Sequence, residues 1–178
     1  MRTLKLEEIP EGGLDLVWQE ERASLLTYME DLSGIDFDFE SSLRSEVKIK
    51  KAGRSVLITG KVETTLQLQC VRCLKKFSYP LSSRFELSLL PLKEASLEEE
   101  VELINEDMES SFFEGGEIHL SEIACEQVFL EIPYQPICRE GCKGLCSICG
   151  QDLNVSSCQC MKQEWRSGFS ALQKLKLD

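Results

Sequence analysis

The sequence predicts an α+β protein: a mainly antiparallel β-sheet with a few short helices and a C-terminal, zinc-binding cysteine-rich module. Two observations predict this fold class. Apolar and polar side chains alternate along three consecutive segments within residues 42–90, which is the period of half-buried strands. Six cysteines also lie within residues 138–160, and a Cys-x-x-Cys pair lies far upstream at Cys70 and Cys73.

Length and composition indicate one ordinary domain with a small appendage. The chain has 178 residues, of which 42% are hydrophobic and 29% are charged, so one core can bury most of its apolar surface. We expect a β-rich core at 1–137, with an acidic segment at 93–117, and a cysteine-rich module at 138–178 whose C-terminal helix packs on the core. The first residues lack the apolar stretch of a signal peptide and no apolar run would span a membrane, which favours a cytoplasmic protein.

The first residues predict short elements. One or two strands within residues 2–18 flank a turn at 10–13, where a proline and two glycines lie close together. A short helix is expected at 20–32, because acidic side chains begin it and apolar side chains recur on one side.

A three-stranded antiparallel meander is expected next. From 55 to 70 the even positions are apolar or small and the odd positions are mostly polar, which predicts a long half-buried strand. A shorter alternating segment precedes it, and Ala52 and Gly53 between them predict a hairpin. A third alternating segment follows Cys73. We expect one face of this sheet to be apolar and the other to be rich in Lys and Arg.

The second half predicts less regular structure before the cysteines. Residues 93–117 are acidic and irregular, apart from a candidate edge strand at 101–104. A helix is expected at about 121–131, with Ser121 as its N-cap and Pro133 beyond its end. The helix side chains expected in the core are Ile123, Cys125, Val128 and Leu130.

The cysteines predict metal binding and not disulfides. Nine is an odd number, and no signal peptide precedes them. Pairs of cysteines a few residues apart are typical of structural zinc sites, which take four thiolates in a tetrahedron and leave no open position for catalysis. The eight candidate metal ligands are Cys70, Cys73, Cys138, Cys142, Cys146, Cys149, Cys158 and Cys160.

The spacing predicts one or two zinc ions. We assign the last four cysteines, within residues 146–160, to one site, because the eight-residue loop between their two pairs closes at small entropic cost. The pairs Cys70–Cys73 and Cys138–Cys142 are each half a site, and together they would pin the C-terminal segment to the sheet. Alternatively, the pairs Cys138–Cys142 and Cys146–Cys149 form one site, or the cysteines hold an iron–sulfur cluster.

Charge is unevenly distributed along a chain whose net charge is -11. Residues 44–93 carry 11 basic and 3 acidic side chains, while residues 94–138 carry 13 acidic side chains and no Lys or Arg. The basic block favours a polyanionic partner and the acidic block a polycationic one. The candidate RNA-binding residues, on the predicted hairpin or beside the upstream cysteine pair, are Lys48, Lys50, Lys51, Arg54, Lys61, Arg72, Lys75 and Lys76.

Three separated motifs occur in one order: LQCVRCLKKFSYPL, then IHLSEIACEQVFLEIPYQPIC, then CKGLCSICGQDLN followed by CQC. Together they resemble the YceD family of large ribosomal RNA subunit accumulation proteins. The resemblance implies a bacterial or organellar protein that large-subunit ribosomal RNA needs in order to accumulate, with no established enzymatic activity. It also implies that a small basic large-subunit ribosomal protein is often encoded beside such a chain.

Two functional hypotheses from different classes follow. The first is a non-enzymatic ribosome-biogenesis factor that binds large-subunit ribosomal RNA through a basic hairpin and zinc knuckle. The second is a chaperone-like acidic protein that binds a basic large-subunit ribosomal protein. We expect no catalytic residues and no small-molecule substrate, because no Ser-His-Asp set surrounds the single histidine and no Gly-rich phosphate loop is present.

Overall fold

The computed structural model describes residues 2–29, 37–91, 110–113 and 115–160. These residues form mostly β-sheet with two α-helices, as the predicted α+β class requires. In chain order the elements are β1 (Thr3–Lys5), the 3₁₀ helix η1 (Leu6–Glu8), β2 (Leu14–Glu20), α1 (Arg22–Met29), β3 (Phe37–Phe39), β4 (Leu43–Ala52), β5 (Ser55–Gln69), β6 (Lys76–Pro91), β7 (Ser110–Phe113), β8 (Glu117–His119) and α3 (Leu120–Leu130).

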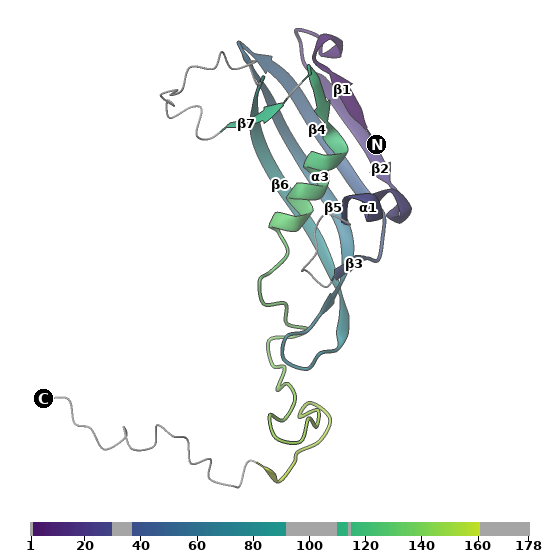
Figure 1. Ribbon diagram of the computed structural model, residues 1–178, viewed down its shortest axis with the longest axis vertical. Helices are drawn as coiled ribbons and strands as arrows, with labels where there is room; N and C mark the ends of the chain where they lie inside the picture. Colours follow the sequence, from purple (N-terminus) through teal and green to yellow (C-terminus); the bar gives the residue numbers. More distant parts are fainter. Residues whose placement is uncertain (1, 30–36, 92–109, 114, 161–178) are drawn as a thin grey trace, which may run out of the picture.

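The main sheet has the strand order β2-β4-β5-β6-β7, and β3 pairs with part of β5. Its centre is the antiparallel meander β4-β5-β6 that the alternating sequence predicts. The expected hairpin joins β4 to β5, where Ala52 pairs with Ser55 and Gly53 has a φ of 63°. Figure 1 shows α3 lying across one face of these strands, with the cysteine-rich segment beyond the opposite end of the sheet from this hairpin.

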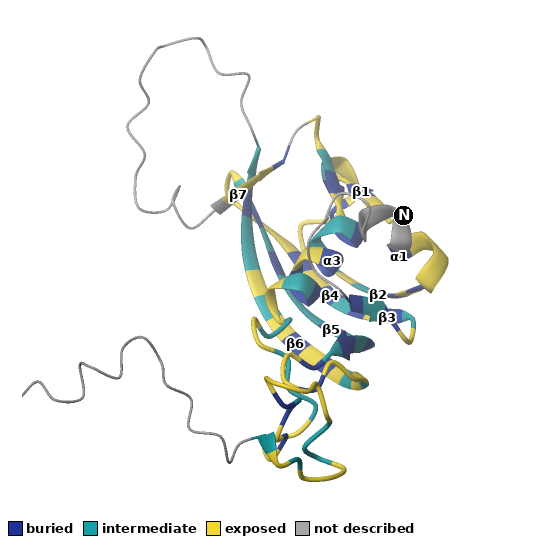
Figure 2. Ribbon diagram, turned by 60° about the horizontal axis from the view of Figure 1, so that its bottom comes forward, coloured by how far each residue is buried: buried dark blue, intermediate teal, exposed yellow. Residues whose placement is uncertain are grey.

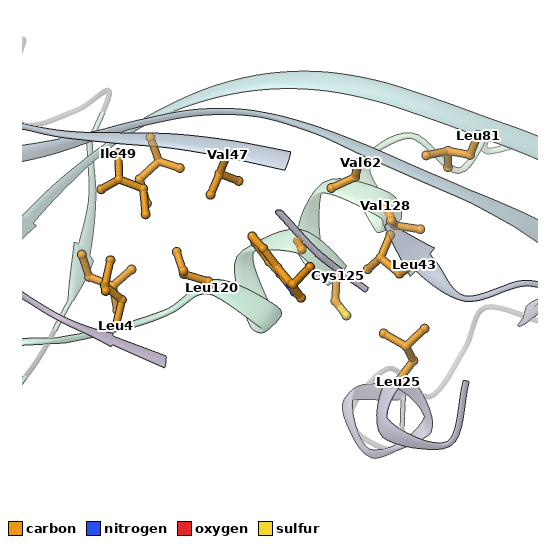
Figure 3. Close-up of a cluster of buried hydrophobic side chains, with 14 of the residues drawn as sticks. Leu4, Leu25, Leu43, Val47, Ile49, Val62, Leu81, Leu120, Cys125 and Val128 are labelled. Carbon is orange, nitrogen blue, oxygen red and sulfur yellow. The ribbon is translucent and has the colours of Figure 1, made fainter. Parts of the chain in front are cut away.

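The alternation along β5 places its even-numbered side chains in the core. Val56, Ile58, Val62, Leu66 and Leu68 are all buried, and the odd-numbered side chains between them lie on the outward face. Burial of such a side chain stabilises the fold by about 1.5–3 kcal/mol. The close-up in Figure 3 shows how side chains from both helices and several strands meet beneath the sheet.

One small residue interrupts this apolar row at the middle of β5. Gly60 pairs with Phe85 of β6, and a Cβ atom at Gly60 would lie 2.6 Å from a ring carbon of Phe85. It would also lie 2.8 Å from a methyl group of Val47 in β4. The phenyl ring therefore fills the space that a larger side chain at Gly60 would occupy.

Helix α3 covers the inner face of the sheet with a stripe of small and apolar side chains. Leu120, Ala124, Cys125 and Val128 recur at helical spacing and are all buried. Burial raises the pKa of the Cys125 thiol to about 12, as expected for a packed core cysteine. The expected burial of Leu130 is wrong: its side chain is 78% exposed, because it belongs to the last turn of α3 and lies off this stripe.

The predicted N-cap role of Ser121 is also wrong. His119 is the N-cap, and Ser121 lies inside the first turn of α3, where it is buried. Its hydroxyl accepts a hydrogen bond from the backbone N–H of Arg2 at 2.6 Å and donates one to the carboxylate of Glu20. Ser121 therefore joins the N-terminus, β2 and α3 in one buried polar contact.

We expect Ser121→Ala to lower the free energy of unfolding by about 1–3 kcal/mol, because the substitution leaves the buried Glu20 carboxylate short of a donor. Urea unfolding measures this change. The control is Ser78→Ala on the exposed outward side of β6, which we expect to stay within about 0.5 kcal/mol of the wild type. Equal effects of the two substitutions would contradict a stabilising role for the Ser121 hydroxyl.

The acidic segment 93–117 is more regular than expected at its end. Residues 110–113 form β7, which pairs in parallel with β6, and β8 begins at Glu117 and pairs with β1. The candidate strand at 101–104 and the expected C-terminal helix lie outside the described residues. Among the helices that the structure describes, none has the length and apolar character needed to cross a membrane.

Candidate metal centre

A tight turn between β5 and β6 carries the upstream cysteine pair. The backbone N–H of Leu74 donates to the carbonyl of Cys70 at 2.9 Å, and the N–H of Cys70 donates to the carbonyl of Lys75 at 2.9 Å. Leu74 has a φ of 58°, an uncommon conformation for a residue with a side chain. The turn holds the thiols of Cys70 and Cys73 on the same side, at the end of the sheet.

The second pair, Cys138 and Cys142, docks on this turn and completes a first cluster with Cys70 and Cys73. The four Sγ atoms lie within 4.8 Å of one another. The Sγ atoms of Cys70 and Cys142 are 3.9 Å apart, and those of Cys73 and Cys138 are 3.8 Å apart. Zinc–sulfur bonds of 2.3 Å in a tetrahedron place sulfurs about 3.8 Å apart, whereas a disulfide needs about 2.05 Å. The donor set thus fits one tetrahedral ion.

The first cluster is shielded from water. Cys70, Cys73 and Cys142 are 0%, 4% and 3% exposed, and apolar side chains that include Ile137 and Leu145 pack around them. Burial by itself raises the pKa of the Cys70 thiol, but backbone N–H groups of Cys138, Cys73 and Arg72 outweigh it and lower that pKa to about 6. The backbone therefore already favours a thiolate at Cys70, which is the form that binds metal.

A second cluster lies within the cysteine-rich segment itself. It consists of Cys146, Cys149, Cys158 and Cys160, whose Sγ atoms also lie within 4.8 Å of one another. Backbone N–H groups of Cys149 and Ile148 lower the pKa of the Cys146 thiol to about 6. Unlike the first cluster, this one reaches the surface, because Cys149 is exposed.

The structure groups the last four cysteines in the one set to which spacing assigned them. Of the two alternatives left open for Cys138 and Cys142, it shows the set with Cys70 and Cys73 and not the set with Cys146 and Cys149. Each set could hold a metal ion. In each set the four Sγ atoms lie within 4.8 Å of one another, which is too close to enclose the several irons and sulfides of an iron–sulfur cluster. Metal binding by these residues and the identity of the ion stay predictions.

Polar contacts that the sequence did not predict join the β5–β6 turn to the cysteine-rich segment. The Arg72 guanidinium donates to the carbonyl of Cys142 at 3.0 Å, and the Leu145 N–H donates to the carbonyl of Arg72 at 2.9 Å. Lys75 forms an ion pair of 2.5 Å with Asp152, which holds the pKa of that carboxyl at about 2. Asn154 contacts Cys142 itself. The one sequence signal for the contacts of Asp152 and Asn154 is their Asp-x-Asn spacing, which is common in turns.

Gly144 provides a test of this junction. It has a φ of 74°, and a Cβ atom there would lie 2.8 Å from the carbonyl oxygen of Arg72. We expect Gly144→Ala to destabilise the docked segment by about 1–3 kcal/mol, because both the backbone conformation and the close approach disfavour a side chain. Hydrogen exchange at the Leu145 amide measures this. Gly141→Ala, where nothing lies within 4 Å of the added atom, is the matched control, and equal effects would refute the close-packing argument.

The structure does not gather the eight candidate RNA-binding residues on one surface. The hairpin loop, with Lys50, Lys51 and Arg54, lies at the start of β5, and Lys76 lies beyond its end. The 15 residues of β5 separate the hairpin loop from Lys76 by about 45–50 Å. Arg72 and Lys75, beside Lys76, are engaged in the contacts with the cysteine-rich segment described above.

The outward face of β4, β5 and β6 carries more Lys and Arg than acidic side chains, as the sequence predicts, but cations at its middle already have acidic partners. Lys48 pairs with Asp15 at 3.5 Å, and Lys61 pairs with Glu63 at 2.5 Å. A hollow of about 740 Å³ on these strands is lined by as many carboxylates as cations. Its charged lining residues are Asp15, Glu46, Lys48, Lys61, Arg84 and Glu86. Charge is therefore balanced across the middle of the sheet, which disfavours nucleic-acid binding there.

Comparisons with known proteins agree with the resemblance of the motifs. A family model described as large ribosomal RNA subunit accumulation protein YceD matches residues 58–176. The chain is 26% identical to the chloroplastic large ribosomal RNA subunit accumulation protein YCED homolog 1 of Arabidopsis thaliana, over 96% of this chain and 60% of that protein. No solved structure shows a significant match.

Two further relatives carry no assigned function. The chain is 29% identical to uncharacterized proteins of Mycobacterium tuberculosis and Mycobacterium bovis, over 67% of its own length and 55% of theirs. The chain thus spans little more than half the length of these relatives, and 60% of the plant protein.

Proposed function

Because this chain belongs to the YceD family, we propose that it promotes the accumulation of large-subunit ribosomal RNA as a non-enzymatic factor that binds the RNA. The name of the plant relative supports the process. The observation that carries RNA binding is the cationic β4–β5 hairpin: Lys50, Lys51 and Arg54 are exposed, and none forms an ion pair with another described residue. Such cations are available to phosphates.

We further propose that each cysteine cluster holds one zinc ion, which would supply structure and no chemistry. An ion in the first cluster would tie the segment that follows α3 to the sheet, and an ion in the second would hold that segment in shape. An ion bound by four thiolates carries a net charge of about −2. Arg72 beside the first cluster would offset part of this charge, whereas Lys75 is already paired with Asp152. This leaves Lys76 as the cation beside that turn that is available to RNA.

The test of the proposed process is made in cells that lack the protein. We expect the ratio of large- to small-subunit ribosomal RNA to fall, and expression of the chain to restore it. Crosslinking the tagged protein and sequencing the attached RNA should recover large-subunit fragments. An unchanged ratio would refute the process, and a restored ratio without crosslinked ribosomal RNA would refute direct RNA binding.

A second candidate function is binding of a basic large-subunit ribosomal protein. It is favoured by a hollow of about 400 Å³ between β6, β7, β8 and α3, whose lining includes the carboxylates of Glu117, Glu122 and Glu126. Burial and the neighbouring Glu122 raise the pKa of Glu126, so a cationic side chain would be favoured there. Co-purification of such a protein, abolished by Glu122→Gln with Glu126→Gln, would favour this candidate. Purification with RNA alone would count against it.

A further inference from the structure

Asn154 belongs to the loop between two ligands of the second cluster, Cys149 and Cys158, but its side chain reaches the first cluster. Its Nδ2 group donates to the Sγ atom of Cys142 at 3.5 Å. Its Oδ1 atom accepts hydrogen bonds from the backbone N–H of Lys143 at 2.8 Å and from the guanidinium of Arg139 at 3.1 Å. Because a backbone N–H can only donate, Oδ1 must face it, and the amide N–H is left to face the sulfur.

Asp152 gives this loop its shape. Its Oδ1 atom accepts from the backbone N–H of Asn154 at 2.9 Å and from the side-chain amide of Asn154 at 2.8 Å. Its carbonyl accepts from the N–H groups of Val155 and Ser156. Its second carboxylate oxygen pairs with Lys75, on the turn of the first cluster, at 2.5 Å. The loop is therefore anchored on the first cluster from both Asp152 and Asn154.

The ends of the same loop belong to the second cluster. Cys149 immediately precedes it and Cys158 immediately follows it, and both are in the second set of four sulfurs. The backbone N–H of Cys146 also donates to the carbonyl of Gln151 at 2.8 Å. A metal ion in the second cluster would hold both ends of the loop, and so would restrict where Asn154 can lie.

We propose that Asn154 is a positioning residue that couples the two metal centres. A filled second cluster places the amide of Asn154 on the sulfur of Cys142, where the N–H group stabilises the thiolate and slows metal loss from the first cluster. Binding free energies are reciprocal, so metal in the first cluster also favours metal in the second. This inference rests on the proposed metal binding.

The experiment combines Asn154→Ala with Cys158→Ser/Cys160→Ser in the full chain. Zinc stoichiometry is measured first, and then the rate at which a chelator removes each ion. We expect two ions in the wild type and in Asn154→Ala, with release from the first cluster about 10- to 100-fold faster in the variant. The Cys158→Ser/Cys160→Ser variant should hold one ion and release it as fast as Asn154→Ala releases the ion of its first cluster. Adding Asn154→Ala to that variant should change nothing more.

Cadmium-113 NMR identifies the first cluster independently, as the resonance that remains in the double cysteine variant. This resonance should shift in Asn154→Ala and stay in place in the control, Gln151→Ala, which removes an amide from the same loop that bonds to Ser156. If Asn154→Ala does not fold, Asn154→Asp keeps the acceptor for the Lys143 N–H, places a negative charge beside Cys142, and should release metal faster still.

The outcomes separate the inference from the proposal beneath it. Two results would overturn the coupling and leave the metal proposal standing. In the first, Asn154→Ala binds two ions and releases the ion of the first cluster at the wild-type rate. In the second, the effects of Asn154→Ala and of the double cysteine substitution on this rate add up in the combined variant. A reduced wild-type chain that binds no metal would overturn the metal proposal itself.

Discussion

Replacing Cys70 and Cys73 by serine is expected to remove one metal ion and to release residues 134–160 from the sheet. A serine hydroxyl is a poor ligand for zinc, and a site left with two thiolates loses most of a binding free energy of about 10–16 kcal/mol. Among the described residues, hydrogen bonds and one ion pair also hold the segment on the turn, but each contributes far less than this binding free energy. These hydrogen bonds include those from the Val71 amide to Pro136 and from the Leu145 amide to Arg72.

The sheet itself should stay folded in this variant, because its apolar core is separate from the small cluster around the cysteines. Figure 2 shows the buried residues concentrated beneath α3, with the cysteine-rich segment outside this layer. Hydrogen exchange at the Val71 and Leu145 amides should become about 100-fold faster or more, while amides of central β5 keep their protection.

The matched control for this variant is Cys125→Ala. Cys125 is buried in the apolar core beneath the sheet and belongs to neither set of four sulfurs. Its replacement should therefore lower stability and leave the metal content unchanged. Retention of two ions in the Cys70→Ser/Cys73→Ser variant, or unchanged protection of the two amides, would show that the first cluster does not pin the segment.

The second large effect is expected on RNA affinity when Lys50, Lys51 and Arg54 are all replaced by glutamine. Binding of large-subunit RNA fragments at about 0.1 M salt should weaken about 10- to 100-fold. Each lost phosphate contact reduces the slope of log affinity against log salt by about 0.7–0.9, so the slope should fall by about 2. Filter binding across a salt series measures both quantities.

The control for this prediction is Lys48→Gln with Lys61→Gln. These lysines lie on the same two strands but already pair with Asp15 and Glu63, so their loss should change RNA affinity less than about 3-fold. Equal effects of the two variants would mean that RNA contacts the middle of the sheet. An unchanged salt slope in the triple variant would remove the hairpin from the interface.

Local patterns in the sequence were enough to predict the central sheet. The alternation along β4, β5 and β6 was read correctly because the period of a strand depends only on neighbouring residues and one buried face. Because such patterns report only on neighbouring residues, two predictions about α3 were wrong. Helical spacing placed Val128 correctly, but the exposure of Leu130 depends on where the helix leaves the sheet, and the role of Ser121 depends on Glu20 and Arg2.

The sequence by itself determined the long strands, their hairpin, and the local halves of each sulfur cluster. Those features depend on side-chain period and on short loops, whose closure costs little entropy. Only the tertiary structure decided that Cys138 and Cys142 meet Cys70 and Cys73, that Asn154 bridges the clusters, and which cations already have partners. These contacts join residues that are mostly far apart in the chain, so they depend on the packing of all the elements between them and leave no period in the sequence.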